Sequence, residues 1–384
     1  MSRLLIVANR LPITARDVDG DVQIEPSTGG LATGLGPLHA RGDGLWIGWT
    51  GAVDSSSASY RRRLEAELVA RRLVCVPLGP DDVERFYDHM SNGILWPVFH
   101  YQSPPPHVDE GDWRTYEAVN ERFADVVARH YANGDRIWVH DYHLLLLPEL
   151  LRRRLPHARI GFFLHIPFPS SEVFRTLPGR ERLLTGMLGA DVIGFHTASY
   201  MRCFAAAVMR VLGVIADVDK IRLPGRDVTM GVFPMGIDAR AFEAVAAEPS
   251  VEEEVRAIRG DTDTRLLVGI DRLDYTKGIP RRLLAFERLL ERHPELHGRI
   301  RLVQVGVPSR EDVGAYQALR AQAYELVGRI HGRFATPHWV PIHWINRALT
   351  REAVVALYRA ADVMLVTPIR DGMNLVAKEF VASR

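Results

Sequence analysis

The stretch that decides the fold is residues 266–292, LLVGIDRLDYTKGIPRRLLAFERLLER. It begins with a short apolar run, Leu266–Ile270, which is typical of a strand buried on both faces of a parallel sheet. A polar loop ends at Gly278, and Pro280–Arg292 then repeats apolar residues at the spacing of an amphipathic helix. A strand, a loop and a helix in this order predict an α/β domain, in which ligands bind at the carboxyl ends of the strands.

The same alternation occurs in two series along the chain. The first series has apolar runs at Leu4–Ala8, Ile137–His140, Ile160–Leu164 and Val192–Phe195, and helical patterns at Arg61–Arg72, Tyr116–Tyr131, Leu144–Arg154, Ser171–Leu188 and Ala198–Leu212. The second series adds runs at Ile300–Val305, Trp339–Trp344 and Val363–Val366, and helical patterns at Glu311–Ile330 and Arg351–Ala360. We therefore predict an α/β protein with two doubly wound domains that face a cleft.

The boundary between the two series is expected at a hinge near Gly236. Residues 1–238 would form the first domain and residues 239–384 the second. The second domain has four strand candidates, whereas a doubly wound domain usually has about six. We therefore expect this domain either to be truncated at its C-terminus, which we favour, or to be unusually small. The strand edges that truncation would expose leave association into a homo-oligomer open.

The overall composition excludes several classes of function. The 384 residues carry 48 Lys+Arg and 47 Asp+Glu, a net charge of +1, so no general field attracts nucleic acid or an anionic membrane. No apolar run is long enough for a membrane span or a signal peptide. The 2 cysteines do not form a disulfide framework. We expect a cytoplasmic protein that binds neither nucleic acid nor membranes and builds its anion sites locally.

Cationic side chains that follow predicted strands are the candidates for binding anions. Arg272 and Lys277 follow the strand Leu266–Ile270, and such a pair suits a diphosphate leaving group, whose charge it would neutralise as Mg²⁺ does. The alternative is two solvated charges on a loop. Arg10, at the exit of the first strand, offers a planar fork to a phosphate, although by itself it is typical of a surface arginine.

Three further loops carry polar residues at or near strand exits. The glycine-rich turn at Gly29 and Gly30 would present backbone N–H groups to a phosphate, but it lacks the spacing of the known nucleotide loops. Asp371 follows the strand Val363–Val366, Gly372 then permits an unusual backbone, and the helix expected from Asn374 onward opens an anion or hydroxyl site. Glu379, two turns along that helix, can face the same ligand.

The histidines of residues 138–143, WVHDYH, raise the question of a metal site. His140, Asp141 and His143 are too close along one strand exit to converge on a metal, so we favour Asp141 as an acceptor for a substrate hydroxyl. His165 follows another buried strand, and we place it at the cleft rather than in the core. The Asp-x-Asp pairs at residues 17–21 are expected in a variable polar loop without flanking strands. We expect no metal and no cofactor.

Taken together, seven strings resemble retaining glycosyltransferases of family 20. They are the Asn9-Arg10 start, Gly29-Gly30-Leu31, and residues 91–101, 138–144, 161–169, 272–278 and 367–379, which read SNGILWPVFHY, WVHDYHL, GFFLHIPFP, RLDYTKG and TPIRDGMNLVAKE. The resemblance covers nearly the whole chain. It implies the GT-B fold and transfer of glucose from a nucleotide diphosphate glucose, commonly UDP-glucose, to glucose 6-phosphate. The product would be α,α-trehalose 6-phosphate, formed with retention.

The resemblance also implies roles for individual residues, without an enzyme nucleophile. The acceptor would be held by Arg10, Tyr87, Trp96, Asp141 and Arg310. The donor would be held by Gly29, Gly30, His165, Arg272, Lys277, Asp371, Gly372, Met373, Asn374, Leu375, Val376 and Glu379. Catalysis would depend on Asp141, His165, Arg272, Lys277 and Asp371, with the leaving diphosphate helping to deprotonate the attacking hydroxyl.

Several alternatives stay open at this point. A sister enzyme with another phosphorylated acceptor, such as a glucosylglycerol-phosphate synthase or an aminocyclitol pseudo-glycosyltransferase, would share most of these strings. A non-catalytic synthase-like subunit would have lost charged site residues, and none is lost here. A GT-B phosphorylase would need a pyridoxal lysine, for which only Lys378 is a rough candidate. The nucleotide base (uracil, adenine or guanine) is also open.

Overall fold

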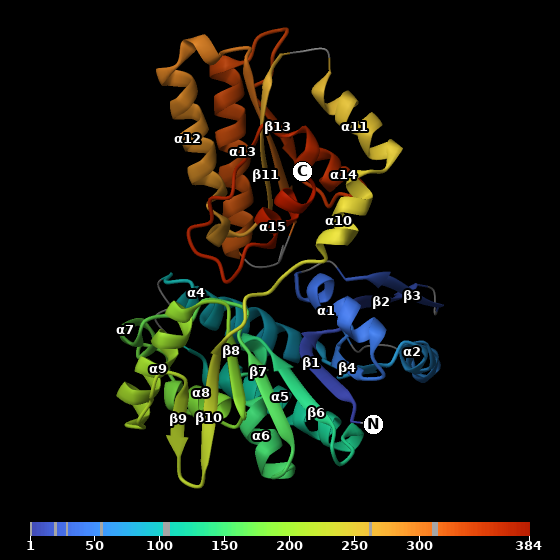
Figure 1. Ribbon diagram of the computed structural model, residues 1–384, viewed down its shortest axis with the longest axis vertical. Coiled ribbons are helices and arrows are strands. Elements are labelled where there is room, and N and C mark those ends of the chain that lie inside the picture. Colours follow the sequence, from blue (N-terminus) through green and yellow to red (C-terminus); the bar gives the residue numbers. More distant parts are fainter. Residues whose placement is uncertain are drawn as a thin grey trace. The chain divides into compact units, whose positions relative to one another are not determined.

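The computed structural model describes residues 2–18, 21–27, 30–53, 57–102, 108–260, 263–308 and 314–384. The chain forms two compact units, Met1–Met235 and Gly236–Arg384 (Figure 1). The division falls at the segment where the sequence predicts a hinge. The assignment of an acceptor to the first unit and a donor to the second stays a prediction.

The first unit is built on a predominantly parallel sheet. Within the described residues the strand order is β5-β4-β1-β6-β7-β8-β10-β9, and only β9 runs antiparallel to its neighbour. The strands are β1 (Leu4–Arg10), β4 (Leu45–Trp49), β5 (Leu73–Cys75), β6 (Arg136–His140), β7 (Arg159–Phe163), β8 (Val192–Phe195), β9 (Lys220–Leu223) and β10 (Arg226–Val232). Strands β1, β6 and β7 are adjacent, so the loops after Arg10, His140 and Phe163 leave the same edge of the sheet.

Helices connect these strands. They are α1 (Gly30–Arg41), α2 (Ala58–Ala70), α3 (Pro80–Asp82), the π-helix η1 (Val83–Leu95), α4 (Trp96–Phe99), α5 (Glu110–His130), the 3₁₀ turn η2 (Tyr142–Leu144), α6 (Leu147–Arg154), α7 (Ser171–Phe174), α8 (Arg180–Met187) and α9 (Ala198–Leu212). A π-helix is rare and is frequent at functional sites. Here it carries Tyr87 and ends immediately before Trp96.

Two expectations for the first unit are wrong. The segment expected as a variable loop forms a hairpin of β2 (Ile13–Val18) and β3 (Asp21–Pro26). Ile13 pairs with Pro26 at one end of this hairpin and Val18 with Asp21 at the other. The helix expected over Ser171–Leu188 is two helices, α7 and α8, because Pro178 and Gly179 interrupt it and Gly179 takes φ 66°.

The second unit has a parallel sheet covered by helices on both faces. The order is β13-β12-β11-β14 within the described residues, formed by β11 (Arg265–Arg272), β12 (Ile300–Val307), β13 (Ile342–Ile345) and β14 (Val363–Met364). The helices are α10 (Ala239–Ala246), α11 (Pro249–Arg259), the 3₁₀ turn η3 (Tyr275–Lys277), α12 (Ile279–Arg292), the 3₁₀ turn η4 (Pro294–Leu296), α13 (Gly314–Phe334), α14 (Arg351–Ala360) and α15 (Leu375–Ala382). Figure 1 shows α12 and α13 on one side of β11 and α14 on the other.

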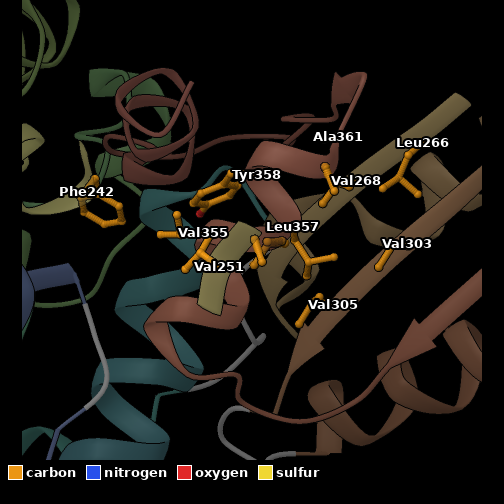
Figure 2. Close-up of a cluster of buried hydrophobic side chains, with 13 residues drawn as sticks. Phe242, Val251, Leu266, Val268, Val303, Val305, Val355, Leu357, Tyr358 and Ala361 are labelled. Atoms are coloured by element: carbon orange, nitrogen blue, oxygen red, sulfur yellow. The ribbon is translucent and has the colours of Figure 1, made fainter. Parts of the chain in front are cut away.

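Each face of this sheet has its own core. Leu266 and Val268 of β11 pack with α10, α11 and α14, and Figure 2 shows this cluster with Phe242 at its edge and Tyr358 near Val355. The opposite face packs Leu302 of β12 against apolar residues of α12 and α13. The continuous apolar run of β11 is thus explained, because alternate residues enter different cores. Burying each such side chain contributes about 1.5–3 kcal/mol.

Two strand predictions in the second unit are too long. The run Trp339–Trp344 becomes a strand only from Ile342, because Pro341 has no N–H to donate and Trp339 instead pairs with Thr336. The run Val363–Val366 pairs only over Val363–Met364. Separately, no helix in the described parts of the chain combines the length and the apolar character that a membrane crossing requires.

Candidate functional site

Arg10, the last residue of β1, lies on an aromatic surface. Its Cζ is 4.9 Å from the ring centroid of Trp49, and Nη2 donates a 3.0 Å hydrogen bond to Oγ1 of Thr14. Gly51, at φ 87°, leaves room for the guanidinium, because a Cβ there would collide with Nη2. Burial lowers the pKa of Arg10. This partly desolvated cation would be better satisfied by a bound anion than by water.

Tyr87 extends the aromatic surface. Its ring meets that of Trp49 edge-on at 5.7 Å and stacks on that of His143 at 5.7 Å, with 9° between the planes. We call Trp49, Tyr87 and His143 the aromatic bed. The bed joins the exit of β4, the π-helix and the exit of β6, so residues from three distant parts of the sequence meet, and Trp49 and Tyr87 among them lie near Arg10.

Trp96 is connected to the aromatic bed through Asn92 and Tyr142. The Asn92 Nδ2 donates to the carbonyl oxygen of Tyr87 at 2.9 Å, and the Tyr142 hydroxyl donates to Oδ1 of Asn92 at 2.7 Å. The Trp96 ring lies 5.6 Å from that of Tyr142 and is only 5% exposed. Of the expected acceptor residues, Arg10, Tyr87 and Trp96 thus belong to one connected cluster.

Two expected site residues, Arg310 and Gly29, lie outside the described residues. Gly30 is the first residue of α1 and is exposed, so its backbone stands at a helix N-terminus. That position suits the contact with an anion that the sequence predicts for it.

Asp141 and His165 are held together at the exits of β6 and β7. Oδ1 of Asp141 accepts a 3.2 Å hydrogen bond from the backbone N–H of His165, and the Asp141 N–H donates to the carbonyl oxygen of Phe163 at 2.8 Å. Asp141 takes φ 74°, a left-handed conformation that is costly for a residue other than glycine. Such strain is found where the surrounding structure imposes a conformation that function needs.

The two other histidines of this region do not converge with Asp141 on a metal. Nδ1 of His140 lies 2.9 Å from Nε2 of His165, whereas the His143 ring stacks on Tyr87. Among the described residues no group of three His, Cys, Asp or Glu side chains is arranged to hold a metal ion. Burial lowers the pKa of His140 to about 3 and lowers that of His165 well below its usual value, where His140 and His196 add to the effect.

In the second unit, Lys277 and Asp371 form an ion pair between two strand-exit loops. Nζ of Lys277 lies 2.6 Å from Oδ2 of Asp371, and the two side chains are 11% and 19% exposed. Gly278 allows the approach, because it takes φ 68° and a Cβ there would lie 2.6 Å from the carbonyl oxygen of Thr367. The Ile369 N–H donates to the Thr276 carbonyl oxygen at 2.8 Å, which fastens the loops to each other.

The loop before α15 is organised by Asp371. Its Oδ1 accepts a 2.9 Å hydrogen bond from the backbone N–H of Gly372, and Asn374 caps α15 by accepting from the N–H of Ala377 at 3.1 Å. Met373 lies between them and is half-buried. Arg272, by contrast, is exposed at the end of β11. One cation of the expected pair is therefore anchored, and the other extends toward solvent.

Glu379 lies within α15, and a hydrogen bond connects it to the hydrophobic core. The hydroxyl of Tyr358 donates to its Oε2 at 2.8 Å, and Tyr358 itself belongs to the cluster in Figure 2. Burial raises the pKa of Glu379, although the hydrogen bond from Tyr358 opposes this. Val376 packs against the same core, while Leu375 is half-buried at the start of the helix.

The sequence analysis missed a buried polar network beneath these loops. Nη1 of Arg282 contacts Oδ2 of Asp271 at 2.6 Å and Oε1 of Gln304 at 2.8 Å, while Nε donates to Oγ1 of Thr367 at 2.9 Å. Gly269 makes room, since a Cβ would lie 2.5 Å from Nη1. Burial raises the pKa of Asp271, and Arg282 opposes it. The sequence did contain a signal that Arg282 is buried, because Arg282 falls on the same helical face as the apolar residues Ile279 and Phe286.

Comparison with known proteins identifies the class of this site. The sequence pattern of glycosyltransferase family 20 matches residues 2–384, and the chain belongs to that family. It is 45% identical to an α,α-trehalose-phosphate synthase (UDP-forming) of Botryotinia fuckeliana, over 100% of this chain and 74% of the relative.

Solved structures show the same fold. One is an α,α-trehalose-phosphate synthase (UDP-forming) from Burkholderia xenovorans in complex with glucose 6-phosphate, with a TM-score of 0.88 and 34% identity, covering 100% of this chain and 83% of that one. Another is the N-terminal domain of Candida albicans trehalose-6-phosphate phosphatase, with a TM-score of 0.89 and 34% identity, covering 100% and 80%. The expectation of a GT-B fold is confirmed.

Proposed function

We propose that this protein transfers glucose from UDP-glucose to glucose 6-phosphate and releases UDP and α,α-trehalose 6-phosphate, with retention at the anomeric carbon. The observation that carries the proposal is the full-length similarity to UDP-forming synthases, at 45% identity for the relative from Botryotinia fuckeliana. These relatives are UDP-forming, which supports the uridine nucleotide that the sequence left open, and one related structure contains glucose 6-phosphate.

In the first unit, Arg10 and Tyr87 would bind the phosphate of glucose 6-phosphate, together with Arg310 of the second unit. Trp96 would also contact this acceptor. The proposal is supported by the position of Arg10 on the aromatic bed, which leaves the remaining guanidinium N–H groups for a phosphate. Asp141 would accept hydrogen bonds from acceptor hydroxyls, and the hydrogen bond that Oδ1 accepts from the His165 N–H helps to orient its carboxylate.

Lys277 and Arg272, which both belong to the second unit, would bind the donor diphosphate. The glucose would be held by Asp371 and His165 and by the backbone of Gly372, Met373 and Asn374, and Glu379 would accept from the ribose hydroxyls. Leu375 and Val376 would line the nucleotide site, and Gly29 and Gly30 would add backbone N–H groups. Asp371 orients Lys277 through their 2.6 Å contact.

The chemistry needs charge stabilisation more than a strong base. The bond from the anomeric carbon to the diphosphate oxygen breaks, and a bond to the 1-hydroxyl oxygen of glucose 6-phosphate forms on the same face. The hydroxyl proton passes to the departing diphosphate oxygen. Cations stabilise the negative charge that develops there, which is the role proposed for the anchored Lys277 and the exposed Arg272.

The experiment that tests the proposal measures UDP release from the purified full chain, with product identified by NMR. UDP-glucose with glucose 6-phosphate should give the α,α-1,1-linked product, whereas glycerol 3-phosphate as acceptor should give little turnover. A preference for glycerol 3-phosphate would favour the sister enzyme, and ADP-glucose or GDP-glucose in place of UDP-glucose tests the base.

A second candidate is a synthase-like domain without catalysis. The structural similarity to a domain of a trehalose-6-phosphate phosphatase supports it, because fold similarity alone does not separate the two. Absence of turnover with every donor, together with retained binding of UDP-glucose or glucose 6-phosphate, would establish it.

We also propose a cytoplasmic location. Within the described residues, Cys75 and Cys203 form no disulfide, which suits a reducing compartment. Fractionation of cells that produce the natural protein would test this.

A further inference from the structure

One proton lies in the contact between His140 and His165, and its position decides whether His165 can donate or accept a hydrogen bond at its other ring nitrogen. Nδ1 of His140 and Nε2 of His165 are 2.9 Å apart, a hydrogen-bond distance. Two neutral imidazoles share a single proton in such a contact, so one ring donates and the other accepts. Both rings are neutral at physiological pH, because burial lowers the pKa of each.

The surroundings of His140 distinguish the two arrangements. Its side chain is 0% exposed, and within the described residues its Nε2 has no hydrogen-bond partner. If His165 donated, the proton of His140 would have to reside on that buried Nε2 as an orphaned N–H group. If His140 donates from Nδ1, its Nε2 is a bare acceptor, and buried groups left without a partner are less often donors than acceptors.

We infer that His140 is a positioning residue that donates its Nδ1 proton to Nε2 of His165 and thereby fixes His165 as a donor through Nδ1. The ring of His165 is further confined by Phe163 and His196, at centroid distances of 4.6 and 5.5 Å. In the described part of the chain no hydrogen bond occupies Nδ1 of His165, and the side chain is partly exposed. A fixed N–H donor is thus available to a ligand.

This inference rests on the proposed function, and it makes that function more specific. In a neutral imidazole that carries its proton on Nδ1 and accepts a hydrogen bond at Nε2, no free lone pair is left to remove the acceptor proton. His165 would therefore donate to an oxygen of the transferred glucose and would not serve as general base. The proton of the attacking hydroxyl is then left to the leaving diphosphate oxygen.

The first test observes the proton directly. Long-range ¹H–¹⁵N correlation spectra of the full chain labelled with ¹⁵N-histidine should show His165 as the neutral Nδ1–H tautomer, with its signals assigned from a His165→Asn sample. His140 should show the same tautomer. A His165 that carries its proton on Nε2, or one that is charged near neutral pH, would overturn the inference.

The second test uses a matched pair of substitutions at His140. His140→Asn places an amide nitrogen near the position of Nδ1 and retains a donor, whereas His140→Leu removes it. We expect kcat with UDP-glucose and glucose 6-phosphate to fall roughly 10- to 100-fold in the leucine variant, as when other histidine-orienting partners are lost. The asparagine variant should recover most of this activity. Equal kcat values in the two variants, both folded by circular dichroism, would contradict the inference.

The outcomes separate the inference from the proposed function. Wild-type turnover with His165 protonated on Nε2 would refute the inference alone. The Nδ1–H tautomer without turnover on any donor would refute the proposed function and leave the proton assignment standing. If neither variant folds, the wild-type spectrum decides.

Discussion

The two units hold their candidate phosphate-binding cations by different means. In the first unit, Arg10 lies over Trp49 and bonds a hydroxyl, and no carboxylate within the described residues pairs with it. In the second, Lys277 is paired with Asp371, and this pair lies above a buried Arg282–Asp271 pair. A cation on an aromatic ring is available to bind a ligand through charge. A cation paired with a carboxylate is kept in position, but a bound diphosphate must share that cation with the carboxylate.

The largest expected effect tests whether ion pairs support the second unit. Arg282→Met leaves the Asp271 carboxylate buried without its partner, so we expect a loss of about 3–5 kcal/mol in the free energy of unfolding. The measurement is urea denaturation followed by circular dichroism. Arg288→Met, on the exposed face of the same helix, is the matched control and should cost little, because its pair with Glu291 is at the surface.

The pH dependence of the same variant has a definite sign. Without Arg282, the pKa of Asp271 in the folded state rises further above its value in the unfolded state. Between these two pKa values, the folded state holds a proton that the unfolded state has already lost. Stability then falls with increasing pH. Arg282→Met should therefore be less destabilised near pH 5 than near pH 8. An equal loss at both pH values would show that Asp271 is not the group responsible.

The next effect concerns catalysis. Lys277→Ala removes the anchored cation, and we expect kcat to fall by about 10²- to 10³-fold, equivalent to about 2.7–4 kcal/mol. Arg272→Ala should have a comparable effect. Lys220→Ala, an exposed lysine on β9, provides the matched control. Turnover close to wild type in Lys277→Ala would remove this residue from the donor site.

A smaller effect is expected at the acceptor side. Arg10→Ala deletes charge-assisted hydrogen bonds to the phosphate, each worth about 1.5–3 kcal/mol, so KM for glucose 6-phosphate should rise roughly 10- to 100-fold. KM for UDP-glucose should change little. Arg10→Lys should recover only part of the loss, since an ammonium cannot offer a planar fork. A change confined to UDP-glucose would reverse the proposed assignment of substrates to the two units.

The smallest effect is expected at Glu379. Burial raises its pKa, so the folded state binds the proton more tightly than the unfolded state, and this carboxyl lowers stability as pH rises above about 4. Glu379→Gln should flatten that decline and change the free energy of unfolding by less than about 1 kcal/mol, as for one neutral hydrogen bond. An unchanged pH profile of unfolding would contradict this.

The elements that sequence reasoning placed well are those with one dominant signal. The run Val192–Phe195 and the helices over Ala198–Leu212 and Arg351–Ala360 have the expected bounds. Strands β5, β9 and β10 were not anticipated, because they are short or interrupted by polar residues, and neighbouring strands rather than periodicity stabilise them. Strand β4 was overlooked although its five residues are apolar or glycine. The π-helix η1 was also missed, although Phe86, Met90 and Ile94 recur in it at helical spacing, and that spacing does not reveal the i→i+5 hydrogen bonds of a π-helix.

By itself, the sequence determined the α/β class and the strand exits at which Arg10, Asp141, Lys277 and Asp371 stand, while the hinge near Gly236 stays a prediction. These follow from local apolar patterning and from the rule that ligands meet the carboxyl ends of parallel strands. Only the tertiary structure decided what each group contacts: the Trp49 ring beneath Arg10, Asp371 beside Lys277, and His140 against His165. Such contacts join residues up to 94 positions apart. They depend on side-chain packing between neighbouring strands, which local spacing does not specify.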